Sequence, residues 1–451
     1  MPAADEHAAA EAPLPSPVGS EETAQLLVPL AGLARLGLAV SGGADSLAMM
    51  HLAADWARSA PHRPALHVLT VDHRLRAASG AEAAAVSVAA GRLGLAATVL
   101  AWGGPKPSSG LAAAARTARY RLLGQAAHDL GLDAVLTAHT LDDQAETLLM
   151  RLARGSGLDG LAGIPARATI DGLVVLRPLL GIAHDRLVAT LQARGVAWIE
   201  DPSNTDDRFE RARIRAARPA LERLGITGRS LAASARRLAR ARTAIEAAVD
   251  AAMAPAAGIV RLSTFGHAEM DWQRLCGLTE EVRLRVSTRV IELVAAPPEP
   301  VSLRRLEALT EARGWGSPAG RTLAGAAFLD AGATATPGSL LVVRELARRP
   351  PGRVVLAPGG SIVWDRRFHV TSTAEAPPVE VAALGASGLA AIEGAGFQRP
   401  AGLRAHALWA VPACRDDSGG VIAVPTLGFV ARGGEGFTCL FPSGGATRHP
   451  V

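Results

Sequence analysis

The sequence predicts an α/β fold with a doubly wound parallel sheet, followed by a helical domain and a small strand-containing C-terminal domain. With 451 residues, the chain is too long for one compact core. Short apolar runs alternate with alanine-rich helical stretches from about residue 36 onward. The predicted strands are residues 36–40, 66–71, 96–102 and 133–138. Because about 25 residues separate them, they need crossover helices and must run parallel.

Changes in composition divide the chain into four segments. Residues 1–24 are rich in Ala, Pro and acidic residues, which predicts a disordered tail. Residues 25–228 hold the predicted parallel sheet, and residues 229–348 continue an Arg- and Ala-rich helical pattern. Beyond a Pro/Gly cluster the apolar runs become short, so residues 349–451 are expected to form the small C-terminal domain.

Composition also limits the class of protein. No uncharged apolar run approaches the roughly 18 residues of a membrane span, so we expect a protein without a membrane segment. Cys276, Cys414 and Cys439 are far apart, which suits neither a disulfide framework nor a metal site and fits a cytoplasmic protein. Residues 208–242 hold eleven arginines and two glutamates. That block either contacts nucleic-acid phosphates or is a set of solvated helix faces, since Lys106 is the only lysine of the chain.

The first predicted strand leads directly into a glycine turn and then into an apolar helix. Glycines let the backbone approach a ligand, and the N-terminus of a helix favours bound phosphate. No lysine stands near this turn as it would in a Walker A loop, so we expect it to hold pyrophosphate. A carboxylate beside phosphates needs a cation, which predicts Mg²⁺ at Asp45. A plain serine-capped turn is the alternative. The loop consists of Ser41, Gly42, Gly43, Ala44, Asp45 and Ser46.

The fourth predicted strand is followed by a second polar segment, residues 139–146. The spacing of Thr140 and Asp143 predicts a capping box at a helix start. A capping box does not account for His139 directly after the strand, nor for Glu146 three residues beyond Asp143. Carboxylates clustered beside an imidazole favour catalysis at this point.

Two further groups fit a ligand site at the same sheet edge. Asp72 and His73 end the second strand and either contact a nucleotide or substrate or form a polar turn. Arg116 and Arg119 lie three residues apart on one face of a helix. They neutralise a phosphate, stack on a base, or are only surface arginines.

Several of these segments carry a family resemblance. The Ser-Gly-Gly-x-Asp-Ser string at 41–46 resembles the signature of the PP-loop, Rossmann-like ATP pyrophosphatases. The Leu-Asp-Asp-Gln-Ala-Glu-Thr and Arg-Gly-Ser-Gly strings within 139–157 resemble the tRNA(Ile)-lysidine synthetase family more specifically. Resemblance is strong over about 36–218 and thin beyond. The chain departs from the family pattern at Ala112 or Ala113, Ala212 and Ala324.

The resemblance implies a two-step reaction on the wobble cytidine of the CAU-anticodon isoleucine tRNA. ATP adenylates the C2 oxygen and releases pyrophosphate, and the ε-amine of free L-lysine then displaces AMP to give lysidine. The implied cofactors are ATP and Mg²⁺, and the implied location is the cytoplasm. Residues 229–348 would handle the tRNA. A homodimer is one possible assembly of the protein. The implied catalytic residues are Asp45, Arg116, His139, Asp143 and Glu146, with Arg211 and Arg215 binding tRNA.

Two alternatives remain. A PP-loop tRNA thiolase shares the adenylation step but needs cysteines to deliver sulfur, and no cysteine precedes Cys276. A non-catalytic nucleotide- and RNA-binding protein would have no need to keep Asp45, His139, Asp143 and Glu146 together. The residues do not show which of His139, Asp143 and Glu146 acts in which half-reaction.

Overall fold

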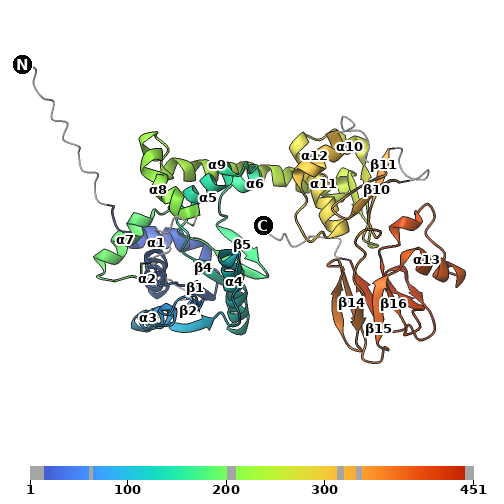
Figure 1. The fold of residues 1–451 in the computed structure, drawn as a ribbon, viewed down its shortest axis with the longest axis horizontal. Helices are drawn as coiled ribbons and strands as arrows, with labels where there is room; N and C mark the ends of the chain where they lie inside the picture. The colour runs from blue at the N-terminus through green and yellow to red at the C-terminus, as the bar shows by residue number, and fades with distance from the viewer. Residues whose placement is uncertain (1–14, 60–63, 201–209, 312–318, 332–337, 442–451) are drawn as a thin grey trace, which may run out of the picture. The chain divides into compact units, whose positions relative to one another are not determined.

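The computed structural model describes residues 15–59, 64–200, 210–311, 319–331 and 338–441 (Figure 1). The chain divides into two compact units after Arg242, and the long helix α9 (Gly228–Met253) begins in the first and ends in the second. The expected boundary at residue 228 lies at the start of that helix, before the division after Arg242, and remains a proposal. The expected division at residue 348 remains a proposal.

The first unit contains a six-stranded sheet in the order β3-β2-β1-β4-β6-β5, in which only β5 runs antiparallel to its neighbour. The chain moves from β1 to β2 and β3 on one side and then crosses to β4 on the other. Ligands collect at such a switch point, at the carboxyl ends of the strands. The predicted doubly wound parallel sheet is confirmed. Its strands are β1 (Arg35–Ala39), β2 (Ala65–Asp72), β3 (Ala96–Ala101), β4 (Ala134–Thr137), β5 (Arg167–Ile170) and β6 (Leu173–Leu176).

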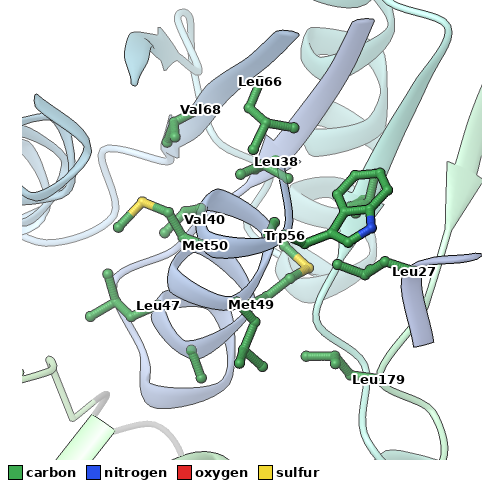
Figure 2. Close-up of a cluster of buried hydrophobic side chains, with 14 of the residues drawn as sticks. Leu27, Leu38, Val40, Leu47, Met49, Met50, Trp56, Leu66, Val68 and Leu179 are labelled. Atoms are coloured by element: carbon green, nitrogen blue, oxygen red, sulfur yellow. The ribbon is translucent and has the colours of Figure 1, made fainter. Parts of the chain in front are cut away.

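Hydrophobic clusters cover both faces of this sheet. Leu36 and Leu38 of β1 point to one face and pack with Met49 and Met50 (Figure 2). On the opposite face, a second cluster includes Leu123. Burial on both faces explains why these strands read as continuous apolar runs. The helices of this unit are α1 (Ser20–Leu27), α2 (Ala44–Ser59), α3 (Ser79–Arg92), α4 (Leu111–Asp129), α5 (Leu141–Ala153), α6 (Leu158–Leu161), α7 (His184–Ala193) and α8 (Glu210–Arg223), with a short 3₁₀ turn η1 (Val28–Leu30).

The N-terminal segment differs from the expected disordered tail of residues 1–24. Residues 1–14 lie outside the described part, but α1 begins at Ser20 and Val18 is buried. The backbone N–H of Val18 donates to Thr190, and Arg186 forms two hydrogen bonds with Glu22. Burial of apolar side chains and this ion pair hold the segment against α7, so the expectation is wrong for residues 15–24.

The second unit contains three antiparallel sheets: β7-β8-β11-β10-β9, β12-β15-β16-β17-β18 and β13-β14-β19. The β7-β8-β11-β10-β9 sheet lies within residues 229–348, which were expected to be helical. The helices α11 (Glu280–Ala295) and α12 (Leu303–Glu311) lie in the same region. The strands are β7 (Val260–Leu262), β8 (Ala268–Asp271), β9 (Arg321–Leu323), β10 (Ala326–Asp330), β11 (Ser339–Arg344), β12 (Val354–Leu356), β13 (Ser361–Trp364), β14 (Phe368–Ser372), β15 (Val379–Ala383), β16 (Pro412–Arg415), β17 (Val421–Val424), β18 (Phe429–Val430) and β19 (Phe437–Leu440).

The helices of the second unit pack against these sheets. One hydrophobic core joins α11 to the β7–β11 sheet through Val290 and Phe328. The strand-containing C-terminal region is confirmed. Across the described residues, no helix is both long and apolar enough to cross a membrane. The helices are α10 (Trp272–Cys276), α11 (Glu280–Ala295), α12 (Leu303–Glu311) and α13 (Gly385–Gly394), with short 3₁₀ turns η3 (Pro255–Ala257), η4 (Ala405–Ala407) and η5 (Pro425–Leu427).

Candidate active site

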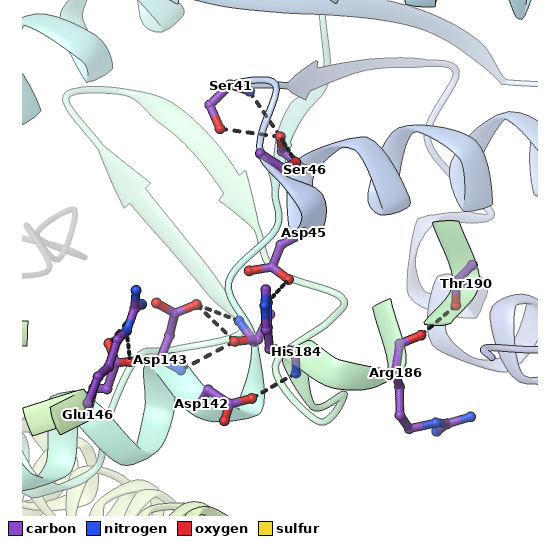
Figure 3. Close-up of polar contacts among 12 residues, drawn as sticks. Ser41, Asp45, Ser46, Asp142, Asp143, Glu146, His184, Arg186 and Thr190 are labelled. Carbon is purple, nitrogen blue, oxygen red and sulfur yellow. Dashed lines mark hydrogen bonds and ion pairs between the residues drawn. The ribbon is translucent and has the colours of Figure 1, made fainter. Parts of the chain in front are cut away.

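The glycine turn lies between β1 and α2 at the switch point of the sheet. Gly42 has φ +89°, and a Cβ there would stand 2.9 Å from the side chain of Ile199. Ser46 accepts a hydrogen bond from the Ser41 N–H at 3.1 Å and donates to the Gly43 carbonyl at 2.9 Å (Figure 3). The turn is thus closed on itself, and it leads into the first turn of α2, where backbone N–H groups lack intrahelical partners.

Asp45 extends from the first turn of α2 toward the start of α7. Its Oδ1 accepts a hydrogen bond from Nδ1 of His184 at 2.8 Å (Figure 3). Burial raises the pKa of Asp45 above its ordinary value, although the hydrogen bond from His184 opposes this change. The same hydrogen bond raises the pKa of His184.

His139 lies two residues after Thr137, the last residue of β4. Its Nδ1 is 2.9 Å from the hydroxyl of Thr137. Burial lowers the pKa of His139 to about 3; the charge of Asp143 opposes this change, and those of Arg177, Arg119 and Arg116 add to it. The imidazole is therefore neutral at physiological pH.

The start of α5 forms the predicted capping box. Asp143 N–H donates to the Thr140 hydroxyl at 3.3 Å, and the Thr140 N–H donates back to Asp143 at 2.8 Å. The Thr140 hydroxyl also donates to Asp143 at 3.1 Å. One oxygen of Asp143 thus has a structural role at the helix start, in addition to any chemistry it performs.

Glu146 lies one turn further along α5 and is buried. Arg215 of α8 donates to Glu146 at 2.6 Å, and the Nε of Arg211 is 3.7 Å from the second oxygen of Glu146. Burial raises the pKa of Glu146 despite these arginines. The two arginines expected to bind tRNA therefore contact a predicted catalytic carboxylate, and their role toward tRNA stays a prediction.

Arg119 of α4 lines a cavity next to the glycine turn. This cavity of about 190 Å³ opens between the ends of β1 and β2 and is lined by Ser41, His73, Arg76 and Arg119, among others. The guanidinium of Arg116 lies 5.0 Å from the ring centroid of Tyr120. The cavity is adjacent to the glycine turn, where the nucleoside of a nucleotide would lie if the turn held its phosphates.

Sequence reasoning missed His184, Arg177 and Arg218 as parts of this site. Among the described residues, the buried Nε of Arg177 and the buried hydroxyl of Tyr120 have no hydrogen-bond partner. Arg218 donates to Asp142 at 2.8 Å. Arg177 directly follows the strand β6, and a charged residue at the end of a buried strand was the available signal.

Comparison with known proteins identifies the class. Residues 17–220 match the PP-loop domain family, which covers the six-stranded sheet and the whole of the site. A curated tRNA(Ile)-lysidine synthase of Bradyrhizobium sp. (strain BTAi1) is 44% identical over 72% of this chain and 89% of its own length. One of Rhodopseudomonas palustris is 45% identical over 65% of this chain and 84% of its own. The protein is thus an ATP-using PP-loop enzyme.

The identity and coverage of these relatives define the family more narrowly. The chain belongs to the tRNA(Ile)-lysidine synthase family.

Proposed function

We propose that this protein joins L-lysine to C2 of the wobble cytidine in the CAU-anticodon isoleucine tRNA through an adenylated tRNA intermediate. The proposal rests on one observation: the loop of residues 41–46 contains no lysine and lies at the same edge of the sheet as Asp45, Asp143, Glu146 and the neutral His139, in a chain of this family. Its product is lysidine, and ATP becomes AMP and pyrophosphate.

In the first half-reaction the C2 oxygen attacks the α-phosphorus and the bond to pyrophosphate breaks. The loop from Ser41 to Ser46 would hold the departing pyrophosphate, and the adjacent cavity would hold the adenosine. Arg116 and Arg119 would neutralise charge that develops on the phosphate oxygens. Lys106 does not take the Walker lysine's place, because its Nζ donates to the Trp102 carbonyl at 2.7 Å.

The residues around Asp45 fit a Mg²⁺ ion that is bound mainly through ATP. Among the described residues, no group of three His, Cys, Asp or Glu side chains could hold a metal by itself. One carboxylate combined with phosphate oxygens and water is the usual binding mode of Mg²⁺. The hydrogen bond to His184 uses Oδ1 of Asp45, which leaves Oδ2 to contact the ion. When bound, Mg²⁺ neutralises charge on the phosphates.

In the second half-reaction the ε-amine attacks C2, the bond to the AMP oxygen breaks, and a proton leaves the nitrogen. A free lysine amine has a pKa near 10.4 and is mostly protonated at neutral pH, so a base must accept a proton. With a pKa of about 3, His139 is a weak base. Burial raises the pKa of Glu146, which makes it the stronger proton acceptor. We assign the proton transfer to Glu146 and the orientation of the reactants to His139.

The product mixture tests this proposal. With ATP, Mg²⁺ and a CAU-anticodon tRNA transcript but no amino acid, the enzyme should release pyrophosphate and leave an adenylated tRNA. Adding lysine, but not arginine or ornithine, should then give a nucleoside of the mass of lysidine. Release of ADP and phosphate would contradict the adenylation step, and lysine incorporation at a wobble uridine would contradict the cytidine specificity.

The thiolase alternative has less support. Cys276, Cys414 and Cys439 all lie outside the matched PP-loop domain, and burial raises the pKa of Cys414 to about 12, which leaves its thiol unreactive. Sulfide in place of lysine should therefore produce no thiolated nucleoside. Location in the cytoplasm and assembly as a homodimer remain parts of the proposal, and light scattering of the purified protein tests the second.

A further inference from the structure

We infer that His184 is a positioning residue for Asp45, holding one oxygen of that carboxylate so that the other faces the cation of the bound nucleotide. The inference rests on the proposed role of Asp45 as the Mg²⁺ ligand. His184 lies outside the glycine turn and outside the 139–146 segment.

The geometry of the pair sets the direction of the hydrogen bond. Nδ1 of His184 is 2.8 Å from Oδ1 of Asp45 (Figure 3). An ionised carboxylate only accepts hydrogen bonds, so the imidazole donates through Nδ1–H. Within the described residues, Oδ2 of Asp45 makes no hydrogen bond. The hydrogen bond from His184 therefore occupies Oδ1 of Asp45 and leaves Oδ2 for the cation.

His184 is itself held in place from two sides. Its backbone N–H donates to Oδ2 of Asp142 at 2.7 Å, and the Leu141 N–H donates to the Ile182 carbonyl at 2.9 Å. These bonds tie the start of α7 to the start of α5. Oδ1 of Asp142 accepts from Arg218 at 2.8 Å, so both oxygens of this carboxylate are occupied. The backbone of His184 is therefore held in place, and its imidazole can orient the Asp45 carboxylate.

A purely structural ion pair would behave differently. The side chains of His184 and Asp45 are 46% and 30% exposed, and exposed ion pairs contribute little to stability. Residues that hydrogen-bond to a metal ligand instead change metal affinity, by roughly 10–100-fold when they are replaced. Metal affinity therefore separates the two roles, whereas stability does not.

The test measures binding of Mn²⁺ to the full chain with ATP present and tRNA absent, from the electron paramagnetic resonance of free Mn²⁺. His184→Ala should weaken Mn²⁺ binding by about 10-fold. His184→Asn should restore it to within about threefold of the wild type, because the Asn side chain places an N–H donor close to the position of Nδ1. Thermal unfolding of both variants checks that they fold. His128→Ala, an exposed histidine at the end of α4, serves as the matched control and should leave Mn²⁺ binding unchanged.

Asp45→Asn separates failure of this inference from failure of the metal site. If Asp45→Asn weakens Mn²⁺ binding while His184→Ala leaves it unchanged, His184 does not position the ligand and the inference is overturned. Failure of His184→Asn to restore binding overturns it as well, since the hydrogen bond would then not be the cause. If Asp45→Asn itself has no effect, the proposed metal role of Asp45 is what fails.

Discussion

Asp45 in the first unit and Asp365 in the second are carboxylates beside cationic groups, but their surroundings differ. Asp365 has a side chain only 7% exposed, and its Oδ2 contacts Arg344 at 3.3 Å and Arg367 at 2.7 Å. In the part of the chain that the structure describes, the side chain of Asp45 has one hydrogen-bond partner, His184, and burial raises the pKa of Asp45. Asp365 therefore has its charge matched in the folded chain. Asp45 carries a charge that is matched only in part, as expected of a group that awaits a ligand.

Arg367 shows what the matched charge does. Its guanidinium donates to the carbonyl oxygens of Gly266, Val294 and Ala410, which belong to three separate segments of the second unit. Burial lowers the pKa of Arg367 to about 10, so it stays charged at neutral pH beside Asp365. The fully paired charge of Arg367 joins distant parts of the fold, whereas Asp45, whose charge is matched only in part, lies at the carboxyl edge of the parallel sheet.

Asp365→Asn should have the largest effect on stability. It leaves the buried guanidinium of Arg367 without its carboxylate, and breaking a buried pair in this way costs about 3–5 kcal/mol. Urea unfolding measures the loss, while adenylation per folded molecule should not change. Asp417→Asn, at an exposed aspartate of the same unit, is the control. A loss below about 1 kcal/mol would mean that the Arg367 cluster contributes little.

Asp45→Asn should reverse that pattern. Removing the proposed metal ligand should slow adenylation by roughly 100-fold, with tRNA affinity unchanged. Because burial raises the pKa of Asp45, its ionised form destabilises the folded state at neutral pH. The variant should therefore be as stable as the wild type or more stable. Pyrophosphate release and thermal unfolding measure the two effects, and equal losses in adenylation and tRNA binding would count against the metal role.

The two units also differ in how far the sequence predicts them. Four of the five parallel strands of the first unit were predicted because burial on both faces produces apolar runs. The β5–β6 hairpin was missed, although Asp171 and Gly172 between its strands have φ +48° and +83°, as an Asp-Gly hairpin turn requires. The β7–β11 sheet was missed because strands such as Arg321–Leu323 are too short to show a period, and their pairing depends on distant partners.

The site was predicted where its residues are neighbours in the chain. The glycine turn and the capping box of Thr140 and Asp143 follow from local spacing. The contact between Asp45 and His184 joins residues 139 positions apart, and that between Glu146 and Arg215 joins residues 69 apart. Such contacts are created by the packing of α7 and α8 near the sheet edge, which no periodicity in the sequence encodes.

Burial lowers the pKa of one histidine in each unit, so the two units can be compared by how their stability depends on pH. Burial lowers the pKa of His267 to about 4, although Glu269 opposes this change. An unfolded histidine has a pKa near 6.5, so the folded state loses stability as pH falls from 6.5 toward 4. His267→Gln should remove about 2 kcal/mol of the loss between pH 7 and pH 5. His139→Gln should act in the same direction, since its pKa of about 3 is also depressed. Urea unfolding at both pH values measures these changes, and parallel pH profiles for His267→Gln and wild type would rule out the neutral buried form.

The smallest predicted effect concerns Arg211 and Arg215, whose contacts with Glu146 were not foreseen. Each phosphate that an arginine neutralises contributes roughly −0.7 to −0.9 to the slope of log K against log salt. Replacing both with Ala should therefore flatten the slope for tRNA binding by about 1 to 2 units. Arg353 of the second unit, which pairs with Glu380 and lies outside residues 229–348, is the matched control, and Arg353→Ala should leave the slope unchanged.

Glu146→Gln sharpens this prediction, because it removes the carboxylate charge that competes with phosphate for both guanidinium groups. If these arginines contact tRNA, the Gln variant should bind tRNA more tightly than the wild type at low salt, and the difference should shrink as salt screens the phosphates. The Glu146→Gln variant should bind tRNA more tightly and yet fail to transfer lysine, because it lacks the proposed proton acceptor. Tighter tRNA binding combined with loss of the second half-reaction would show that Glu146 has two roles. It would accept the proton from lysine, and it would compete with tRNA phosphates for Arg211 and Arg215. An unchanged slope in the double Ala variant, together with unchanged affinity in Glu146→Gln, would mean that Arg211 and Arg215 serve only to neutralise Glu146.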